Sequence, residues 1–588
     1  TLLPSSTTTA SYLLGISHNT PVLSVVTDPQ NLYGNTGIFD NWGTDWQRAT
    51  HVDYFDSTKQ HIFSQKAGMQ IDGGWGGSRS QPQHSFRIEL DNGVLGEGSI
   101  EYPLIPNRPN RTKYSNIYLR NGSNQYLVLP YKDACQVEMM AAQTNNYYSA
   151  WQPVTVYING GYFGLYELRE KFDAEYFKTL DDADTDSLDI LSLSAWGNGI
   201  LRPVEGATEH FWADYQAFNT LDPTAPDYWQ QADQYIDLSW YTDYIIGESW
   251  MGNTDWPGNN IKIYRSNATD FRWRFCLIDQ ELAMAPNSWT DCYLDHIAFM
   301  LSQSTDNPYI NIWLQSLQNE QYRHYFINRF ADVMNTAYRN ERLLDIENTF
   351  FDLTAIEMQK EFARWGDPNN IAGQMQSFYD NHQTFRTQLA ARTEQVRQHI
   401  QDNFQLPNQV EVTLYTQPEG SGAIRISTIT PDTNPWQGIY FNGVPIQIVA
   451  MPAPGYNFSH WSGNNLITTP NNPLFSGILA NPAPFFQANF VAYNTAIEPS
   501  ATTSTAFSLA PNPATNVLWV QKNTSSTATN KPTVCQIIDL TGRIVLEQKI
   551  INTTTAIDIS QLPASAYVCQ MIQDGSVINT LQWVKIGQ

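Results

Sequence analysis

The chain has few basic residues, few cysteines and no long apolar segment. Its 588 residues contain 33 Lys and Arg against 57 Asp and Glu, which gives a formal net charge of −24. Such a negative field repels nucleic acid and anionic membranes, so we expect neither as a partner. No stretch approaches the roughly twenty apolar residues that a membrane-spanning helix needs, so we also expect no transmembrane segment.

The five cysteines are widely spaced and form no Cys-x-x-Cys pair or Cys/His cluster. A zinc site is therefore not expected. Cys276 and Cys292 could form a disulfide in an oxidising compartment, although two reduced core cysteines are the favoured interpretation. The sequence also has no Gly-x-Ser-x-Gly elbow, which argues against a serine hydrolase.

The most distinctive motif is Asn253-Thr-Asp-Trp-Pro-Gly-Asn-Asn260, which is followed along the chain by Asp279-Gln-Glu281. These residue types suit phosphoryl transfer. Asp255 could accept a hydroxyl proton, Asn260 could hold one metal ion, and Asp279 could hold the metals that bridge nucleotide phosphates. Protein kinases have the same Asp-to-Asn spacing in their catalytic loop. The alternative interpretation is a plain turn, because Asn, Pro and Gly also favour turns.

The neighbouring sequence predicts where these side chains lie. Apolar spacing over residues 239–252 predicts a helix that ends at Gly252, so Asp255 follows in a loop. Residues 261–264 and 273–278 predict two strands joined by a polar turn. Asp279 would then lie at a strand end, where the hairpin could bring it back beside Asp255.

Several ordered blocks resemble the CotH family, which are spore-coat-type proteins with a divergent, secreted kinase domain. The blocks begin with His18-Asn-Thr-Pro-Val-Leu-Ser-Val-Val-Thr-Asp-Pro-Gln-Asn-Leu32 and Gly73-Gly-Trp-Gly-Gly-Ser-Arg-Ser-Gln-Pro-Gln-His-Ser-Phe-Arg-Ile88. They continue with Leu119-Arg-Asn-Gly122, Asn159-Gly-Gly-Tyr-Phe-Gly-Leu-Tyr-Glu-Leu-Arg-Glu-Lys-Phe-Asp173 and residues 253–260. The resemblance implies an atypical protein-kinase-like α+β fold and ATP-dependent phosphorylation of secreted proteins.

The resemblance also implies roles for individual residues. Asp255 matches the catalytic acid of the loop, and Asn260 and Asp279 match metal-holding positions, with help from Glu281. Arg87 and Lys171 are candidates for the phosphate side of the nucleotide, and Glu170 matches an acidic position that orients a phosphate-binding cation. The implied cofactors are ATP and Mg²⁺ or Mn²⁺, since the negative charge of the chain would resist a nucleotide without divalent cations.

Three positions depart from the family pattern, and one of them is Glu281, where relatives often carry an Asp. His84 stands where relatives usually have a Lys, and a neutral imidazole is a poorer partner for phosphate than an ammonium group. Asp72 places an acidic side chain beside the Gly-rich segment, where phosphates favour none. These departures keep open a non-catalytic alternative, in which the chain is a surface scaffold or adhesin that retains the kinase-like fold.

Composition divides the chain into four parts. Residues 1–405 predict a kinase-like domain with two lobes, a β-rich first half and a helical second half. Residues 406–493 predict a small β domain, in which Gly455-Tyr-Asn-Phe-Ser-His-Trp-Ser-Gly463 resembles a bacterial surface repeat. The alternative for this segment is an ordinary β-sandwich with Trp461 in its core. Residues 494–506, rich in Thr, Ser, Ala and Pro, predict a linker.

Residues 507–588 contain Phe507-Ser-Leu-Ala-Pro-Asn-Pro-Ala514, Asp539-Leu-Thr-Gly-Arg543, Ile557-Asp-Ile-Ser560 and Trp583-Val-Lys585. This ordered set resembles the C-terminal sorting domain of the type IX secretion system of Bacteroidetes, and the turn spacing predicts a small β-sandwich. The resemblance implies export across the outer membrane, contact with the secretion machinery, and a secreted or cell-surface location. The hypothesis is thus an exported kinase that phosphorylates Ser or Thr of a secreted or surface protein.

Overall fold

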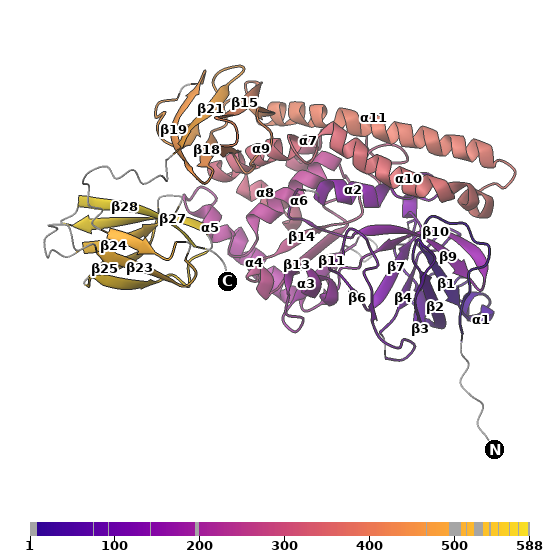
Figure 1. Cartoon of the computed structure of the whole chain (residues 1–588). Coiled ribbons are helices and arrows are strands. Elements are labelled where there is room, and N and C mark those ends of the chain that lie inside the picture. Colours follow the sequence, from indigo (N-terminus) through magenta and orange to yellow (C-terminus); the bar gives the residue numbers. More distant parts are fainter. Residues whose placement is uncertain are drawn as a thin grey trace. The chain divides into compact units, whose positions relative to one another are not determined.

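The computed structural model describes residues 9–74, 76–91, 93–141, 143–194, 199–465, 467–492, 507–512, 514–522, 533–539, 543–550, 552–563, 565–573 and 576–585. The chain divides into two compact units, Thr1–Tyr493 and Asn494–Gln588. The first unit is mixed α+β and the second is all β (Figure 1). The predicted linker, residues 494–506, lies outside the described residues.

The first unit begins with a closed β-barrel in which the parallel pairing of β1 and β9 completes the ring. Around the ring the strands are β1 (Val22–Val26), β2 (Arg48–Phe55), β3 (His61–Ile71), β4 (Phe86–Glu89), β7 (Asn116–Arg120), β10 (Gly161–Arg169) and β9 (Trp151–Ile158). Alternate side chains fill the interior, among them Leu23, Val52, Ile88, Leu119 and Leu168. Successive side chains of a strand point to opposite faces, and in β1 and β9 residues on both faces are buried. A short helix α1 (Pro29–Leu32) and a two-stranded ribbon, β5 (Ile100–Glu101) with β6 (Lys113–Tyr114), belong to the connections.

A second, five-stranded sheet follows the barrel. Its strand order is β12 (Arg202–Glu205), β11 (Asp189–Leu193), β13 (Ile261–Arg265), β14 (Arg274–Leu277) and β8 (Tyr147–Tyr148). The hairpin of β13 and β14 confirms the predicted strand pair. Because β14 also pairs with β8 in parallel, the strand before Asp279 is held on both edges.

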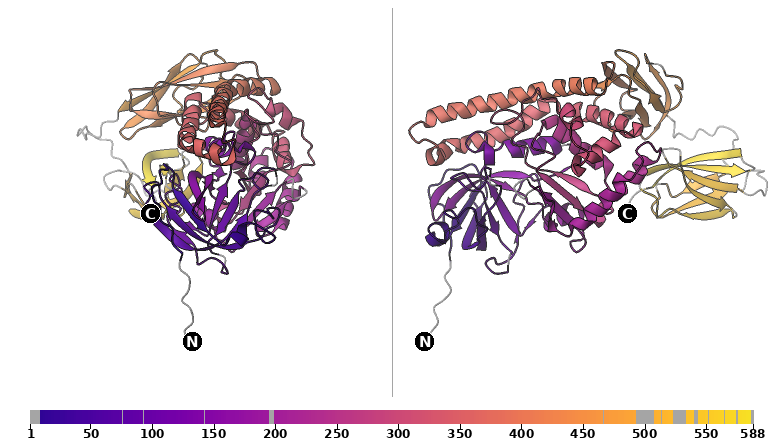
Figure 2. Two further views of the ribbon diagram at one scale, coloured as in Figure 1. Left: turned by 90° about the vertical axis from the view of Figure 1, so that its right-hand side faces the viewer. Right: turned by 180° about the vertical axis from the view of Figure 1, so that it is seen from behind.

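Helices surround this sheet and dominate the rest of the unit. They are α2 (Lys132–Ala141), α3 (Ala174–Asp181), α4 (Thr208–Asn219), α5 (Tyr228–Ala232), α6 (Leu238–Met251), α7 (His296–Leu301), α8 (Pro308–Ser316), α9 (Glu320–Met334), α10 (Asn340–Trp365) and α11 (Ile371–Asn403), with short 3-10 turns η1 (Ser123–Gln125) and η3 (Asn267–Thr269). The prediction of a helix before the Asp255 loop is confirmed by α6. The long α10 and α11 lie side by side along the unit (Figures 1 and 2).

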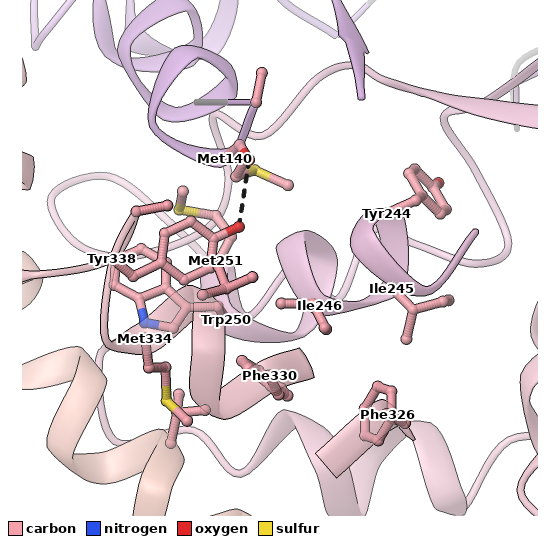
Figure 3. Packing of buried hydrophobic residues seen from close by; sticks show 14 of the residues in the cluster. Met140, Tyr244, Ile245, Ile246, Trp250, Met251, Phe326, Phe330, Met334 and Tyr338 are labelled. Atoms are coloured by element: carbon pink, nitrogen blue, oxygen red, sulfur yellow. Dashed lines mark hydrogen bonds between the residues drawn. The ribbon is translucent and has the colours of Figure 1, made fainter. Parts of the chain in front are cut away.

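Helix α6 is buried on nearly all sides. Its residues Tyr244, Ile245, Ile246, Trp250 and Met251 pack among side chains of α2 and α9, as Figure 3 shows. A helix that is apolar around its whole circumference belongs to the centre of a fold. The loop that carries Asp255 therefore leaves from a rigid part of the molecule.

The end of α6 depends on one buried cation. Arg392 of α11 is fully buried, and its guanidinium donates hydrogen bonds to the carbonyls of Ser249, Trp250, Cys292 and Leu294, at 2.6 to 2.9 Å. The last carbonyls of a helix have no partner within the helix, and a cation there also complements the helix dipole. Arg392 satisfies both needs and ties α11 to the start of the loop.

Residues 406–492 form two small sheets that share the core of the helical region. One sheet has the order β17 (Trp436–Phe441), β15 (Gln409–Gln417), β21 (Phe485–Ala492), β19 (Tyr456–Gly463), and the other has β16 (Gly422–Ile426), β18 (Ile446–Pro452), β20 (Leu474–Gly477). Trp461 is buried in that core, with 3% of its surface exposed. Asp332 of α9 accepts hydrogen bonds from Thr428 (2.7 Å) and Tyr440 (2.6 Å), so buried polar contacts also join the sheets to the helices.

The second unit is a small sandwich of two antiparallel sheets. Their orders are β22 (Phe507–Ala510), β23 (Val517–Lys522), β26 (Thr554–Asp558) and β25 (Ile544–Ile550), β24 (Thr533–Ile538), β27 (Ser565–Gln573), β28 (Ser576–Lys585). Leu518 and Ile557 of one sheet pack with Ile537, Tyr567 and Trp583 of the other. The sequence predicts turns at Pro511–Pro513, Thr541-Gly542 and Asp574-Gly575. Pro513 and the other two pairs lie outside the described residues.

Replacing the buried cation tests its role in the fold. Arg392→Met leaves four carbonyls without their donor while keeping an apolar stem. We expect a loss of about 3 kcal/mol or more in the free energy of unfolding, measured by urea denaturation. The control is Arg425→Met on an exposed position of β16, which should change stability by less than about 0.5 kcal/mol. Equal effects of the two substitutions would contradict this account.

Candidate functional site

The loop that follows α6 is held by its own hydrogen bonds. Gly252 ends the helix with φ of 75°, a left-handed conformation that glycine adopts without strain. The Asn253 side chain accepts from the Asp255 amide (3.1 Å) and donates to Glu248 (3.0 Å). The ring Nε2 of His296 donates to the Asn253 carbonyl at 2.8 Å, and burial lowers the pKa of that imidazole to about 3. Asp255 is thus placed by Asn253, which Glu248 and a neutral His296 hold in turn.

Asp255 faces the two asparagines that end the motif. Its Oδ2 accepts from Asn259 Nδ2 at 3.0 Å and from Asn260 Nδ2 at 2.9 Å. Burial raises the pKa of Asp255, and the nearby charge of Asp279 raises it further. The structure therefore joins Asp255 to Asn260 by a hydrogen bond, and it places Asp279, on a separate segment, near enough for its charge to act on Asp255.

Asp279 and Glu281 share one arginine. Arg120 Nη2 donates to Asp279 Oδ1 at 2.9 Å and also to Glu281 Oε2. The other carboxylate oxygen of Glu281 accepts from the backbone and side-chain amides of Asn124, at 3.1 and 2.8 Å. Burial is the main cause that raises the pKa of Glu281 to about 7. Glu281 could act as the predicted metal ligand only if these contacts broke, whereas 36% of the Asp279 side chain is exposed.

Arg120 belongs to a polar face of the barrel that faces these acids. Paired residues of neighbouring strands share a face, and the register pairs Arg87 with Tyr118, Tyr118 with Arg169, and Arg120 with Glu167. Asp133, at the start of α2, contacts Arg120 at 3.3 Å and Arg169 at 2.9 Å. Its other oxygen accepts from the Gln280 amide at 2.7 Å, between Asp279 and Glu281. Side chains of alternating barrel residues thereby hold residues 279–281 in place.

The sequence reasoning missed Arg120 and Asp133. The available signal was the alternation of apolar and polar residues in Asn116-Ile-Tyr-Leu-Arg120 and Glu167-Leu-Arg169. Such alternation marks a strand with one buried face, but it does not say what covers the other face.

The Gly-rich segment is braced close to this face. Arg79 Nε donates to the Gly73 carbonyl at 2.8 Å, and Gly73 has φ of 100°. Gly77 lies so near to Ser123 and Asn124 that an added Cβ would come within 2.6 Å of their backbone atoms. Asp72 pairs with Arg87 at 3.0 Å, which offsets its charge beside the segment. Trp75, between the glycines, lies outside the described residues.

His84 is a packing residue. It is buried against Trp42 and Phe39, and its Nδ1 donates to the Arg79 carbonyl at 2.5 Å. Burial lowers the pKa of the imidazole, which favours the neutral form. The side chain therefore stabilises the Gly-rich segment through the Arg79 carbonyl and supplies no positive charge.

Glu170 and Lys171 lie in different surroundings from each other. Glu170 is buried and accepts hydrogen bonds from Arg111 (2.9 Å), Arg108 (3.2 Å) and the Ala150 amide (2.9 Å). The cations that it orients in this structure are therefore Arg108 and Arg111. Lys171 lies close enough to Lys262 of β13 for the two charges to interact, and Asp72 acts on the same Lys262.

The oxygens around Asp255 suit a hard cation. Among the described residues, no three His, Cys, Asp or Glu side chains form a cluster that could hold a metal ion. Asp255 Oδ1, Asn260 Oδ1 and Asp279 Oδ2, however, accept no hydrogen bond from a described residue. With Asp255 assigned to proton transfer, the amide oxygen of Asn260 and the carboxylate oxygen of Asp279 are donors of the kind that Mg²⁺ and Mn²⁺ prefer. The donor set fits a divalent ion with water completing its shell.

Comparison with known proteins identifies the family of the first part of the chain. The family described as CotH kinase protein matches residues 69–405, which is more than half of the chain and contains every residue of the site. The chain belongs to the CotH kinase family. The resemblance of the first part of the chain to that family is thereby confirmed.

Residues 508–584 match the secretion system C-terminal sorting domain. The chain is therefore an exported CotH protein, which type IX secretion carries to the cell surface or beyond. In the described part of the chain, no helix has the length and apolar character to cross a membrane.

Other comparisons are uninformative. No curated protein matches the chain. A solved structure of the Bacillus anthracis TIE protein is similar at 11% identity and a TM-score of 0.09, over 31% of this chain and 32% of that one. A likeness this slight carries no argument about the site.

The pKa of Glu248, beneath the Asp255 loop, predicts a pH dependence of stability. Burial raises this pKa from 4.5 to about 8, so folding favours the protonated acid. The resulting stabilisation is complete below about pH 4.5 and is lost as pH rises through about 8. Between pH 5 and 8.5 the free energy of unfolding should therefore fall by on the order of 3 kcal/mol through this group. Glu248→Gln should remove this slope of stability against pH, measured by urea unfolding. Glu341→Gln, at an exposed position on α10, should leave the slope intact, and an unchanged slope in Glu248→Gln would refute the assignment.

Proposed function

We propose that the chain transfers the γ-phosphoryl group of ATP to Ser or Thr of a secreted or surface protein. The observation that supports this proposal is the hydrogen bond between Asp255 and Asn260, with Asp279 near enough for its charge to act on Asp255 and one oxygen of each residue left uncommitted by the described residues. Phosphoryl transfer needs little covalent help from a protein, because positioning and charge neutralisation do most of the work.

Each side chain has a role in this scheme. Asp255 accepts the proton of the acceptor hydroxyl, and its hydrogen bonds from Asn259 and Asn260 fix the direction in which it points. Asn260 and Asp279 hold Mg²⁺ or Mn²⁺, which would neutralise charge on the transferring phosphoryl group. The barrel and the helical region correspond to the two lobes of a kinase, with the Gly-rich segment on the barrel side of the site. The net charge of −24 makes the divalent ion necessary for binding a polyanion.

A surface scaffold without turnover is the second candidate. Two observations favour it: Arg120 occupies one oxygen of Asp279, and His84 provides no cation for phosphate. In a scaffold the same ion pairs would simply stabilise the fold. The two candidates differ in whether nucleotide and metal bind together.

Thermal unfolding with ATP and Mn²⁺ tests the proposal. A ligand that binds only the folded state stabilises it by about 2.7 kcal/mol at a concentration of roughly 100 times its Kd. We therefore expect a clear rise in the unfolding midpoint when both are present, and no rise with Asp279→Ala. Asp352→Ala, at an exposed position on α10, should respond as the unchanged protein does.

Transfer itself is measured with radiolabelled ATP and the secreted proteins of the same cells as acceptors. Asp255→Asn keeps the shape of the base without its charge and should lower transfer by roughly 10²- to 10⁴-fold. Its ligand-induced midpoint shift should persist. A midpoint that does not move with ATP and Mn²⁺ would support the scaffold, and transfer that survives Asp255→Asn would exclude Asp255 as the base.

A further inference from the structure

Lys262 is a half-buried cation whose neighbours leave it without a counterion. It lies on β13, just after the Asn260 that ends the motif, and its ammonium group is 5.6 Å from the centre of the Phe172 ring. Among the described residues, none makes a hydrogen bond or ion pair with its Nζ. Lys171, next to Phe172 in sequence, adds a second positive charge close by and likewise has no such partner in the described part of the chain.

The acids nearest to Lys262 are committed elsewhere. Asp72 bonds Arg87 at 3.0 Å through one oxygen and the Gly73 amide at 2.7 Å through the other. Asp173 caps α3 by accepting from the Tyr176 amide (2.9 Å) and also accepts from Asn116 (2.9 Å). Neither comes within ion-pair distance of Lys262. Two adjacent cations that repel each other and lack local acids favour the binding of an anion.

The position of Lys262 in the fold indicates the kind of anion that it would bind. Asp72 begins the Gly-rich segment, and its charge acts on both Lys262 and Tyr118, while the charge of Asp279 acts on the same Tyr118. Lys262 therefore lies two residues after Asn260 on β13 and within range of the charge of Asp72, which begins the Gly-rich segment. Unlike His84, it offers the fixed charge that phosphate binding requires.

We propose that Lys262, assisted by Lys171, binds the polyphosphate chain of the nucleotide. This inference rests on the proposed function, because it assigns the cation that holds the phosphates while Asn260 and Asp279 hold the metal. It also explains how a chain with His84 in place of the usual lysine could still bind ATP. The ammonium group of Lys262 lies over the face of the Phe172 ring, which attracts the cation without a hydrogen bond.

The test compares ATP with adenosine by calorimetry in the presence of Mn²⁺. Lys262→Met removes the charge and keeps a side chain of similar length, so its unfolding midpoint without ligand should stay near that of the unchanged protein. A lost charge-assisted contact predicts at least about a tenfold weaker affinity for ATP and an unchanged affinity for adenosine. Lys262→Arg should recover part of the loss, and Lys178→Ala, at an exposed position on α3, should bind as the unchanged protein does.

The outcomes separate this inference from the proposed function. If the unchanged protein binds ATP and Lys262→Met binds it equally well, the inference is wrong and the proposed function stands. If the unchanged protein binds no ATP, the proposed function is wrong, and inorganic tripolyphosphate then tests the anion site alone. A midpoint rise with tripolyphosphate that Lys262→Met abolishes supports the site, and no rise in either protein overturns it.

An independent observation concerns two cysteines of the sorting domain. Cys535 of β24 and Cys569 of β27 are buried on neighbouring strands, and their Sγ atoms are 2.8 Å apart. Sulfur atoms that are not bonded do not normally approach this closely. Export also carries this domain through an envelope compartment in which disulfides persist.

We infer that Cys535 and Cys569 form a disulfide during export. The two thiols lose two protons and form the S–S bond, and the two electrons reduce the disulfide of an envelope thiol–disulfide oxidoreductase through a mixed-disulfide intermediate. The bond would connect the two central strands of one sheet, β24 and β27. Cys135, Cys276 and Cys292, which are buried in the first unit, remain thiols.

Alkylation of the full chain, exported to a bacterial periplasm and then denatured, tests this bond. Without reductant, maleimide should label Cys135, Cys276 and Cys292, while mass spectrometry finds Cys535 and Cys569 in one linked peptide pair. Reductant should make all five reactive, and Cys535→Ala should leave Cys569 reactive throughout. Labelling of all five cysteines without reductant would overturn the inference.

Discussion

The whole site depends on the buried guanidinium of Arg120. It joins the polar face of the barrel to Asp279, Glu281 and Asp133, and so links the first β structure to both the second sheet and α2. Acids gathered this closely would repel one another, and burial would force them to bind protons. One delocalised cation with several donors compensates them and fixes their orientation.

The two carboxylate oxygens of Asp279 differ in their hydrogen bonding. Arg120 takes one of its oxygens, and the other is open to a cation. Glu281 is buried and is held by Asn124 on its second oxygen, so it stabilises the segment, whereas Asp279 is partly exposed. One short segment thus carries a structural acid and an exposed acid, two residues apart.

Rigidity around the site comes from helix ends and shared cores. Arg392 satisfies the terminal carbonyls of α6, and His296 and Glu248 hold Asn253 in the loop that follows. Residues 406–492 pack against α9 in one continuous core, so this segment supports the helical region as well as extending it. The sorting domain has its own core and belongs to a separate compact unit, which suits a part whose task is export.

Local patterns in the sequence were enough to predict much of this protein. Periodicity located α6 and the β13–β14 hairpin, and ordered motifs identified the CotH family and the sorting domain, because both depend on residues that are close in the chain. Only the tertiary structure showed that Arg120 is the partner of Asp279, that Glu170 belongs to an arginine cluster, and that Lys262 has no counterion among the described residues. These properties depend on which polar faces meet across the fold, and period-two alternation specifies a polar face without specifying what lies opposite.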